Sequence, residues 1–251
     1  MEKELIPKKI HYCWFGKSDM PEFVKYCIST WKEKCPDYEI YEWNETNIDL
    51  NMFDYTKEAY YAKKYAFVSD VIRLYVLYNF GGIYMDTDVE VIRSLDSLLI
   101  NHGFTGFETN TEIPTGIIAA EKNNLFILDQ LNFYKDKHFI NENGIYNLST
   151  NVQYITQLSL EKHNLILNGQ LQELKYGMMI YPTDYFCPKD YLSGKINITD
   201  NTYAIHHFDG SWLTKTSKFK NKIRQNIINI FGYKFYNYIH YIYNMIRANN
   251  K

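Results

Sequence analysis

The clearest chemical signal in the sequence is a pair of acidic residues, Asp86 and Asp88, which follows an apolar run. The run alternates like a strand, and residues two apart on a strand share one face, so the two carboxylates should lie roughly 7 Å apart at the backbone. Carboxylates that face the same way repel, and the simplest group to lie between them is a divalent cation, which prefers oxygen ligands. Such a cation binds a diphosphate and stabilises it as a leaving group. The pair therefore predicts metal-assisted chemistry, although an Asp-x-Asp at a solvated strand end also occurs by chance in many proteins.

A second charged pair, Asp70 and Arg73, lies three residues apart in a segment with helical spacing. Residues at this spacing share one face of a helix, so the two side chains can form an ion pair. Taken alone, the pattern is that of an ordinary and weak surface pair. It becomes much more specific in combination, because a Gly81-Gly82 stop, an aromatic residue and the paired acids follow in order.

The elements that must position these groups alternate between strands and helices. A chain of 251 residues is long enough for one α/β domain with a substantial core. Periodicity and turn residues predict strands at 9–15, 38–43, 83–92, 178–182 and 202–208, and helices at 21–34, 56–80, 124–134 and 151–163. This alternation predicts a largely parallel sheet with helices on its faces. Nucleotides bind such sheets at the carboxyl ends of the strands.

The composition favours a protein of the reducing cytoplasm. The four cysteines form no Cys-x-x-Cys pair, which argues against a zinc ribbon or a thioredoxin-type site. The N-terminal residues contain no apolar signal-peptide core, and no apolar run is long enough to span a bilayer. Aromatic residues make up 17% of the chain, which suits stacking on sugars, bases or a membrane interface. We therefore expect a cytoplasmic protein.

Charge divides the chain into a body and a tail. Residues 214–251 contain eight Lys or Arg and no Asp or Glu, so the tail carries about +8 and the body about −10. A basic helix rich in Ile, Phe and Tyr fits the interface of an anionic membrane. A helix packed on the acidic body, or a dimer contact, explains the pattern equally well. Nucleic acid is the poorer explanation, because the body is acidic and contains no reader motif.

The run from Ser69 to Asp88 resembles the signature of glycosyltransferase family 32, the DXD sugar transferases, and of the related clostridial toxin glucosyltransferase domains. The shared pattern is Ser-Asp-x-x-Arg, a helix, and then Gly-Gly-x-Tyr-x-Asp-x-Asp. Upstream, residues 6–16 resemble the family's first strand, and Trp43 lies where its members end the second strand with an aromatic residue. Downstream, residues 206–212 resemble a third motif. The three motifs occur in the family's order and span about residues 6–213.

The resemblance implies a GT-A fold, which is a single Rossmann-like nucleotide-binding domain, at 1–213, followed by the helical tail at 214–251. It also implies a divalent metal, usually Mn²⁺ with Mg²⁺ as the alternative, and retention of the anomeric configuration. In the family's pattern Asp88 is the main metal ligand and Asp86 contacts the metal and the ribose or sugar. Asp70 and Arg73 hold the donor sugar. The remaining donor-site residues are Trp14, which stacks on the base, Trp43, Ser69, Tyr84 and Trp212.

The third motif supplies the expected third metal ligand, because neutral imidazole suits such a site. His207 belongs to a sequence similar to a His-Phe-x-Gly element of related retaining galactosyltransferases, in which the His binds the metal. The toxin enzymes have a Glu there instead. The resemblance therefore favours His207 over His206. It also implies that Trp212 donates its indole N–H to the diphosphate, with ordinary core packing as the alternative for these residues.

The predicted reaction moves a hexose or N-acetylhexosamine from a nucleotide sugar, with a UDP-sugar favoured and GDP-mannose present in the wider family. The metal and the basic groups stabilise the departing diphosphate. No side chain stands out as a nucleophile, which favours front-face substitution, and a double displacement through a carboxylate such as Glu108 stays open. The predicted acceptor is a lipid-linked glycan, reached at the cytoplasmic face of the inner membrane during bacterial surface or capsular polysaccharide synthesis.

Three other functions stay open from the sequence. A toxin-like transferase that modifies a host protein would be expected to have a secretion signal or a delivery region. A metal-dependent phosphohydrolase that uses the two acids would not explain the tryptophan motifs. A non-catalytic glycan- or membrane-binding module would not need a metal site between clustered acids.

Overall fold

The computed structural model describes residues 3–114, 116–210 and 215–249 of the chain. The chain forms two compact units: unit 1 is Met1–Pro188 with Ile198–His207, and unit 2 is Lys189–Asn197 with Phe208–Lys251. Unit 1 contains the central sheet, and unit 2 contains the long C-terminal helix. The domain boundary expected at residues 213 and 214 stays a prediction. The structure adds that residues 189–197 group with the tail.

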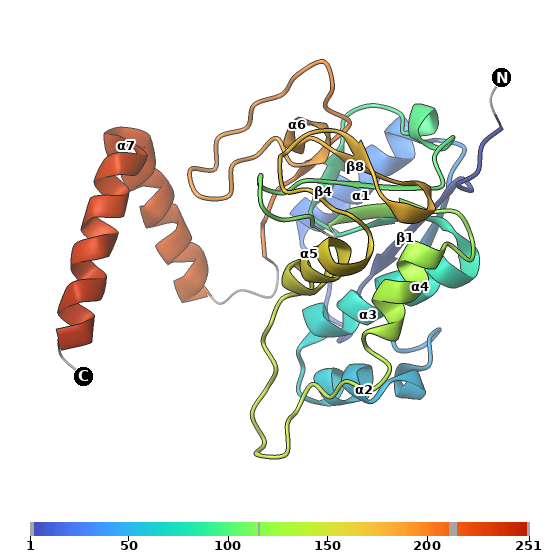
Figure 1. The fold of residues 1–251 in the computed structure, drawn as a ribbon, viewed down its shortest axis with the longest axis horizontal. Helices are drawn as coiled ribbons and strands as arrows, with labels where there is room; N and C mark the ends of the chain where they lie inside the picture. The colour runs from blue at the N-terminus through green and yellow to red at the C-terminus, as the bar shows by residue number, and fades with distance from the viewer. Residues whose placement is uncertain (1–2, 115, 211–214, 250–251) are drawn as a thin grey trace. The chain divides into compact units, whose positions relative to one another are not determined.

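Among the residues described, unit 1 is built on a seven-stranded sheet in the order β2-β1-β3-β6-β5-β8-β7 (Figure 1). β6 and β7 run antiparallel to their neighbours, and the other five strands share one direction. The expected α/β fold with a mostly parallel sheet is therefore confirmed. The strands are β1 (Lys9–Cys13), β2 (Glu39–Trp43), β3 (Gly82–Met85), β5 (Gly103–Gly106), β6 (Ile117–Ala120), β7 (Gln172–Glu173) and β8 (Met178–Tyr181).

A separate two-stranded antiparallel sheet pairs β4 (Val89–Val91) with β9 (Ala204–His206). This small sheet brings a segment near the end of unit 1 back beside the acidic pair. The pairing of β4 with β9 thus brings His206, from the third motif, next to the end of the motif that runs from Ser69 to Asp88.

Helices cover both faces of the central sheet, and each face buries an apolar core. Side chains alternate along β3, so Ile83 and Met85 join the core that contains Trp31, whereas Tyr84 joins the other core. The helices of unit 1 are α1 (Glu22–Lys34), α2 (Asp54–Tyr61), α3 (Tyr65–Phe80), α4 (Leu125–Asn132), α5 (Asn151–Lys162) and α6 (Thr183–Phe186). Burial on both faces explains why the inner strands β3, β6 and β8 are mostly apolar.

Two predicted elements are divided in the structure. The helix predicted at 56–80 consists of α2 and α3, because Lys63 between them adopts a φ of 57°, which a continuing helix does not allow. The strand predicted at 83–92 consists of β3 and β4, which belong to different sheets. Between them the Val89 N–H donates to the Asp86 carbonyl at 3.0 Å, a hydrogen bond of the turn type. The acidic pair therefore lies in a tight turn, and the prediction that it lies on one continuous strand was wrong.

Unit 2 contains α7 (Lys215–Asn249), which confirms the predicted C-terminal helix. In the described part of the chain, no helix combines the length and the apolar character needed to cross a bilayer.

A buried histidine on β1 joins two strands to the end of α3. The indole N–H of Trp43 donates to His11 Nδ1 at 3.2 Å, and His11 Nε2 donates to the carbonyl of Gly81 at 2.8 Å. Both contacts are made at once only by the neutral ring with its proton on Nε2. Burial lowers the pKa of His11 to about 4, although the bond to Gly81 opposes this shift.

We expect the free energy of unfolding to decrease as the pH falls from 6.5, the ordinary pKa of histidine, to about 4. In this window the unfolded chain binds a proton at His11 that the folded protein excludes, so acidification favours unfolding. A shift of this size corresponds to roughly 3 kcal/mol at most. Urea denaturation at a series of pH values measures the slope. His11→Gln can still donate to Gly81 but does not titrate, so its slope should be smaller, and equal slopes in the two proteins would refute the assignment.

Candidate active site

Helix α3 places a charged pair inside the protein. Most of its residues from Val68 to Leu77 are buried in the core, and Asp70 and Arg73 are themselves only 8% and 4% exposed. Arg73 Nη2 donates to Asp70 Oδ1 at 3.0 Å. The alternative of a surface ion pair is therefore wrong. A buried charge that loses its partner is strongly destabilising, so this pair must form for the helix to pack as it does.

Arg73 also connects α3 to the turn that follows β3. Its Nη1 donates to Asp86 Oδ2 at 3.4 Å, and its Nη2 lies 3.3 Å from Asp86 Oδ1. The guanidinium carbon lies 4.6 Å from the centre of the Tyr84 ring, and the Tyr84 hydroxyl donates to Asp86 Oδ1 at 3.1 Å. Arg73 Nε donates to the carbonyl of Ser69 at 3.1 Å. Five residues predicted for the site thus form one bonded cluster: Ser69, Asp70, Arg73, Tyr84 and Asp86.

The electrostatics of the cluster follow from its burial. Burial raises the pKa of Asp70 to about 7, although Arg73 lowers it. Burial likewise raises the pKa of Asp86 against the opposing effect of Arg73. Burial alone would lower the pKa of Arg73, but Asp86, Tyr84 and Asp70 outweigh it and raise that pKa. Arg73 is therefore the permanent positive charge around which the acids are arranged.

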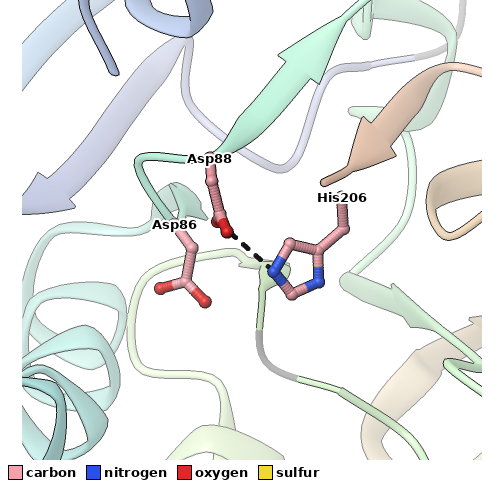
Figure 2. Close-up of side chains that lie close together, drawn as sticks. All are labelled: Asp86, Asp88 and His206. Carbon is pink, nitrogen blue, oxygen red and sulfur yellow. Dashed lines mark ion pairs between the residues drawn. The ribbon is translucent and has the colours of Figure 1, made fainter. Parts of the chain in front are cut away.

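Two acids and a histidine converge beside this cluster (Figure 2). The antiparallel register of β4 and β9 sets Val89 opposite His206, which places the histidine next to the acidic turn. His206 Nε2 lies 3.3 Å from Asp88 Oδ1. One ligand atom from each of Asp86, Asp88 and His206 lies within 4.8 Å of the other two. Carboxylate oxygens and an imidazole nitrogen are suitable donors for Mn²⁺ or Mg²⁺, so these residues fit a divalent cation.

A glycine on the neighbouring chain segment leaves room for this arrangement. The Asp86 N–H donates to the Gly116 carbonyl at 2.8 Å, which fixes the start of the acidic turn. A Cβ on Gly116 would lie 2.8 Å from two ring atoms of His206, closer than real Cβ contacts come. Any other residue at this position would displace the His206 ring.

His207, the histidine that the sequence favoured as metal ligand, contacts another group. Its Nε2 lies 2.8 Å from Glu90 Oε2, and its ring packs edge-on against Phe23 at 5.1 Å. The Tyr26 hydroxyl donates to the other oxygen of Glu90 at 2.7 Å. Successive residues of an extended chain point to opposite sides, so only one of the two histidines can join Asp88. The structure groups His206 with the acids, and we take His206 in place of His207 as the candidate ligand.

Two of the predicted tryptophans lie at the ends of neighbouring strands. Trp14 follows β1, and its backbone N–H donates to the backbone carbonyl of Trp43, the last residue of β2, at 2.9 Å. The Trp14 indole donates to the Ser18 carbonyl at 2.7 Å, and the Trp43 ring stacks on Phe80 at 5.5 Å. β1 also pairs in parallel with β3, whose carboxyl end leads to Asp86. Both tryptophans and the acidic turn therefore lie along one edge of the sheet. Trp212 lies outside the described residues.

Asn151 contacts the site but carried no signal in the sequence. It is the first residue of α5, and its side-chain amide donates to Asp70 Oδ1 at 2.6 Å. Asn151 and Asp70 also line a small pocket with aromatic walls from Phe133, Tyr134 and Tyr154. An Asn at a helix start usually indicates capping, so sequence alone could not assign it to the site.

Glu108, the carboxylate considered for double displacement, follows β5. Burial raises its pKa, His206 opposes this shift, and the nearby carboxylates of Glu112, Asp86 and Asp88 reinforce it. Glu108 therefore lies within the electrostatic field of the acidic turn.

Residues 21–105 match the profile of a family described as "Glycosyltransferase sugar-binding region containing DXD motif". The matched segment contains Asp70, Arg73 and the whole acidic turn, so it carries most of the cluster described above. In this segment the chain is similar to the DXD glycosyltransferases.

Individual proteins are also similar to this chain. Inositol phosphoceramide mannosyltransferase 3 of Schizosaccharomyces pombe is 31% identical over 133 residues, which are 49% of this chain and 35% of that protein. A protein named Toxin from Photorhabdus asymbiotica is 27% identical over 219 residues, covering 68% of this chain and 7% of that protein. Among solved structures, the PaToxG glycosyltransferase matches with a TM-score of 0.48 at 22% identity, over 62% of this chain and 70% of that one. The chain thus spans about a third or less of the length of the two curated relatives.

The two adjacent histidines allow a matched test of the metal group. We expect His206→Ala to weaken Mn²⁺ binding by roughly tenfold or more, because a ring nitrogen that can contact the ion is removed. His207→Ala should change the affinity much less, because its ring is directed to Glu90. Titration of the purified variants with Mn²⁺, followed by electron paramagnetic resonance, measures both affinities. Weaker binding in His207→Ala but not in His206→Ala would restore the ligand favoured by the sequence.

Proposed function

We propose that the chain is a DXD glycosyltransferase that moves a hexose or N-acetylhexosamine from a nucleotide sugar, preferentially a UDP-sugar, to an acceptor hydroxyl. The reaction is proposed to depend on Mn²⁺ or Mg²⁺ and to retain the anomeric configuration. The observation that carries the proposal is the contact of Arg73 with Asp86. It joins a buried permanent cation to the group of acids that suits a metal ion, at the edge of the sheet where nucleotides bind.

Asp86, Asp88 and His206 are the residues that would hold the metal ion. When bound, the ion would neutralise charge on the diphosphate and so stabilise the leaving group. Asp86 is shared with Arg73, so it fixes the position of the guanidinium relative to the other ligands. Arg73 in turn supplies positive charge beside the departing phosphate.

Asp70 and Asn151 are proposed to bind the donor sugar. The carboxylate of Asp70 already accepts from Arg73 and Asn151, which leaves its second oxygen able to accept from a sugar hydroxyl. The same contacts fix the orientation of the carboxylate before the sugar binds. Such preorganisation lowers the entropy lost when the donor is ordered.

Front-face substitution is the proposed chemical step. The bond from the anomeric carbon to the phosphate oxygen breaks, and the bond to the acceptor oxygen forms on the same face of the sugar. The acceptor's proton passes to the leaving phosphate oxygen, so no protein nucleophile is needed. In this scheme Asp70 and Arg73 hold the sugar and the diphosphate in place.

A glycan on a lipid carrier is the proposed acceptor, in bacterial surface or capsular polysaccharide synthesis at the cytoplasmic face of the membrane. One relative is by name an inositol phosphoceramide mannosyltransferase, so a lipid acceptor is compatible with this family. The same name, and those of two Saccharomyces cerevisiae relatives called mannosyl phosphorylinositol ceramide synthases, make a mannosyl donor the second candidate.

A donor panel tests the proposed reaction. Each of UDP-glucose, UDP-galactose, their N-acetyl forms and GDP-mannose is incubated with the protein and Mn²⁺ or with a chelator, and release of the nucleoside diphosphate is measured. We expect slow cleavage of one donor, dependent on the metal and reduced by roughly 100-fold or more in Asp88→Ala. The donor that is cleaved names the sugar and decides between uridine and guanosine diphosphate.

Asp136→Asn is a matched control, because Asp136 is an exposed acid in the loop after α4. It should cleave the donor as fast as the wild type does. If no donor binds or is cleaved with either metal, the proposed transfer fails, and a glycan- or membrane-binding role takes its place.

A further inference from the structure

Unit 2 has a charge opposite to that of unit 1. Unit 2 contains ten Lys or Arg and two Asp or Glu. Unit 1 contains seventeen Lys or Arg and twenty-seven Asp or Glu. The basic charge is concentrated in α7, which has no acidic residue along its whole length. A surface of this kind attracts an anionic partner.

Helix α7 is divided into two limbs, visible as a bend in the red helix of Figure 1. The division falls at Gly232, whose φ of 82° and ψ of 168° interrupt the helix and are accessible mainly to glycine. The first limb, residues 215–231, contains five Lys or Arg. The second limb, residues 233–249, contains two Lys or Arg and six Tyr or Phe. Most of the charge of α7 therefore lies on the first limb, and most of its aromatic residues lie on the second.

The segment 189–197 covers one side of the first limb. The Asn229 side chain donates to the Ser193 carbonyl at 3.0 Å, and the Arg224 guanidinium lies 4.7 Å from the centre of the Tyr191 ring. Ile228, one residue before Asn229, is only 4% exposed. Lys220 and Lys222 lie outside this contact and are exposed. The segment therefore fixes the first limb while its lysines stay available.

The second limb exposes an apolar stripe, in which each residue is 37% to 64% exposed. The spacing of its members along the helix places them on one side. Asn237 and His240 fall on the opposite side. The stripe consists of Phe235, Tyr238, Ile239, Ile242 and Met245. Unit 2 thus presents exposed cations on one limb and an exposed apolar face on the other.

We propose that unit 2 is a docking surface for a bilayer that contains anionic lipid. Lysines of the first limb bind the headgroups, and the apolar stripe of the second limb enters the interfacial region, where Tyr and Phe are favoured. Lys and Arg near an anionic surface each add to the affinity, and buried apolar area adds a term that does not depend on salt. The inference rests on the proposed lipid-linked acceptor and adds how the chain reaches it.

The two limbs together favour this occupant over two others. A nucleic acid would neutralise the lysines, but the aliphatic side chains of Ile239, Ile242 and Met245 cannot stack on bases and would stay in water. A second copy would cover the stripe but would bring two strongly basic limbs close together, where like charges repel. An anionic bilayer would both neutralise the lysines and remove the apolar stripe from water.

Sedimentation with vesicles tests the docking surface in the full-length chain. One set of vesicles is phosphatidylcholine alone, and the other is three parts phosphatidylcholine to one part phosphatidylglycerol. We expect binding to the anionic set that weakens at high salt. Lys220→Gln with Lys222→Gln should lower the affinity by about fivefold for each lysine removed. Phe235→Ser with Ile239→Ser and Ile242→Ser should remove the binding that persists at high salt.

The matched control is Asn237→Ser with His240→Ser on the polar side of the same limb, which should bind like the wild type. Equal binding to both vesicle sets, or equal binding by all variants, overturns the proposal. So does self-association that vesicles do not change, or a preference for single-stranded DNA over the anionic vesicles. Donor cleavage is measured in parallel on the same variants and should be unaltered, so a failure of docking is distinct from a failure of the proposed transfer.

Discussion

The buried guanidinium of Arg73 constrains both the fold and the site. A cation inside the protein is costly unless acids and hydrogen bonds surround it, so folding must bring Asp70 and Asp86 to it. Asp70 arrives through helical spacing, since it lies three residues earlier on α3. Asp86 arrives only if β3 starts and ends at the right place. The same ion pairs that satisfy Arg73 therefore fix the first acid of the acidic turn.

The glycine step between α3 and β3 sets that place. Gly81 and Gly82 have φ values of 65° and 113°, which let the chain reverse from the helix into the strand within two residues. A Cβ on Gly82 would lie 2.7 Å from the Lys9 carbonyl oxygen, so the close approach of β1 and β3 needs glycine as well. His11 bonds to the Gly81 carbonyl from β1 and holds the same step. The two glycines therefore both end α3 and allow β3 to pair with β1. Together these two effects fix the position of Asp86.

The ion pair on α3 and the end of that helix could be predicted from the sequence, because both depend on residues that are close together along the chain. Helical spacing gave the Asp70–Arg73 pair, and the paired glycines gave the end of α3. The turn at Asp86 was missed because β3 and β4 read as one alternating run, and only their pairing with different sheets divides them. Which of His206 and His207 lies beside the acids depends on the register of β9 against β4. A shift of one residue would turn each side chain of β9 to the other face of the strand pair. Asn151 reaches the site through the packing of α5, which no short motif encodes.

Charge balance explains why a metal ion and the donor are coupled in the proposed reaction. Asp70 and Asp86 pair with one guanidinium, Asp88 lies close to Asp86, and unit 1 as a whole carries more acids than bases. Arg73 offsets only part of this negative charge, so without a metal ion the site attracts an anionic diphosphate weakly. A nucleotide sugar that approached alone would meet a negative surface and be repelled. A divalent cation held by Asp86, Asp88 and His206 would make the local charge positive, so the donor would bind together with the metal ion.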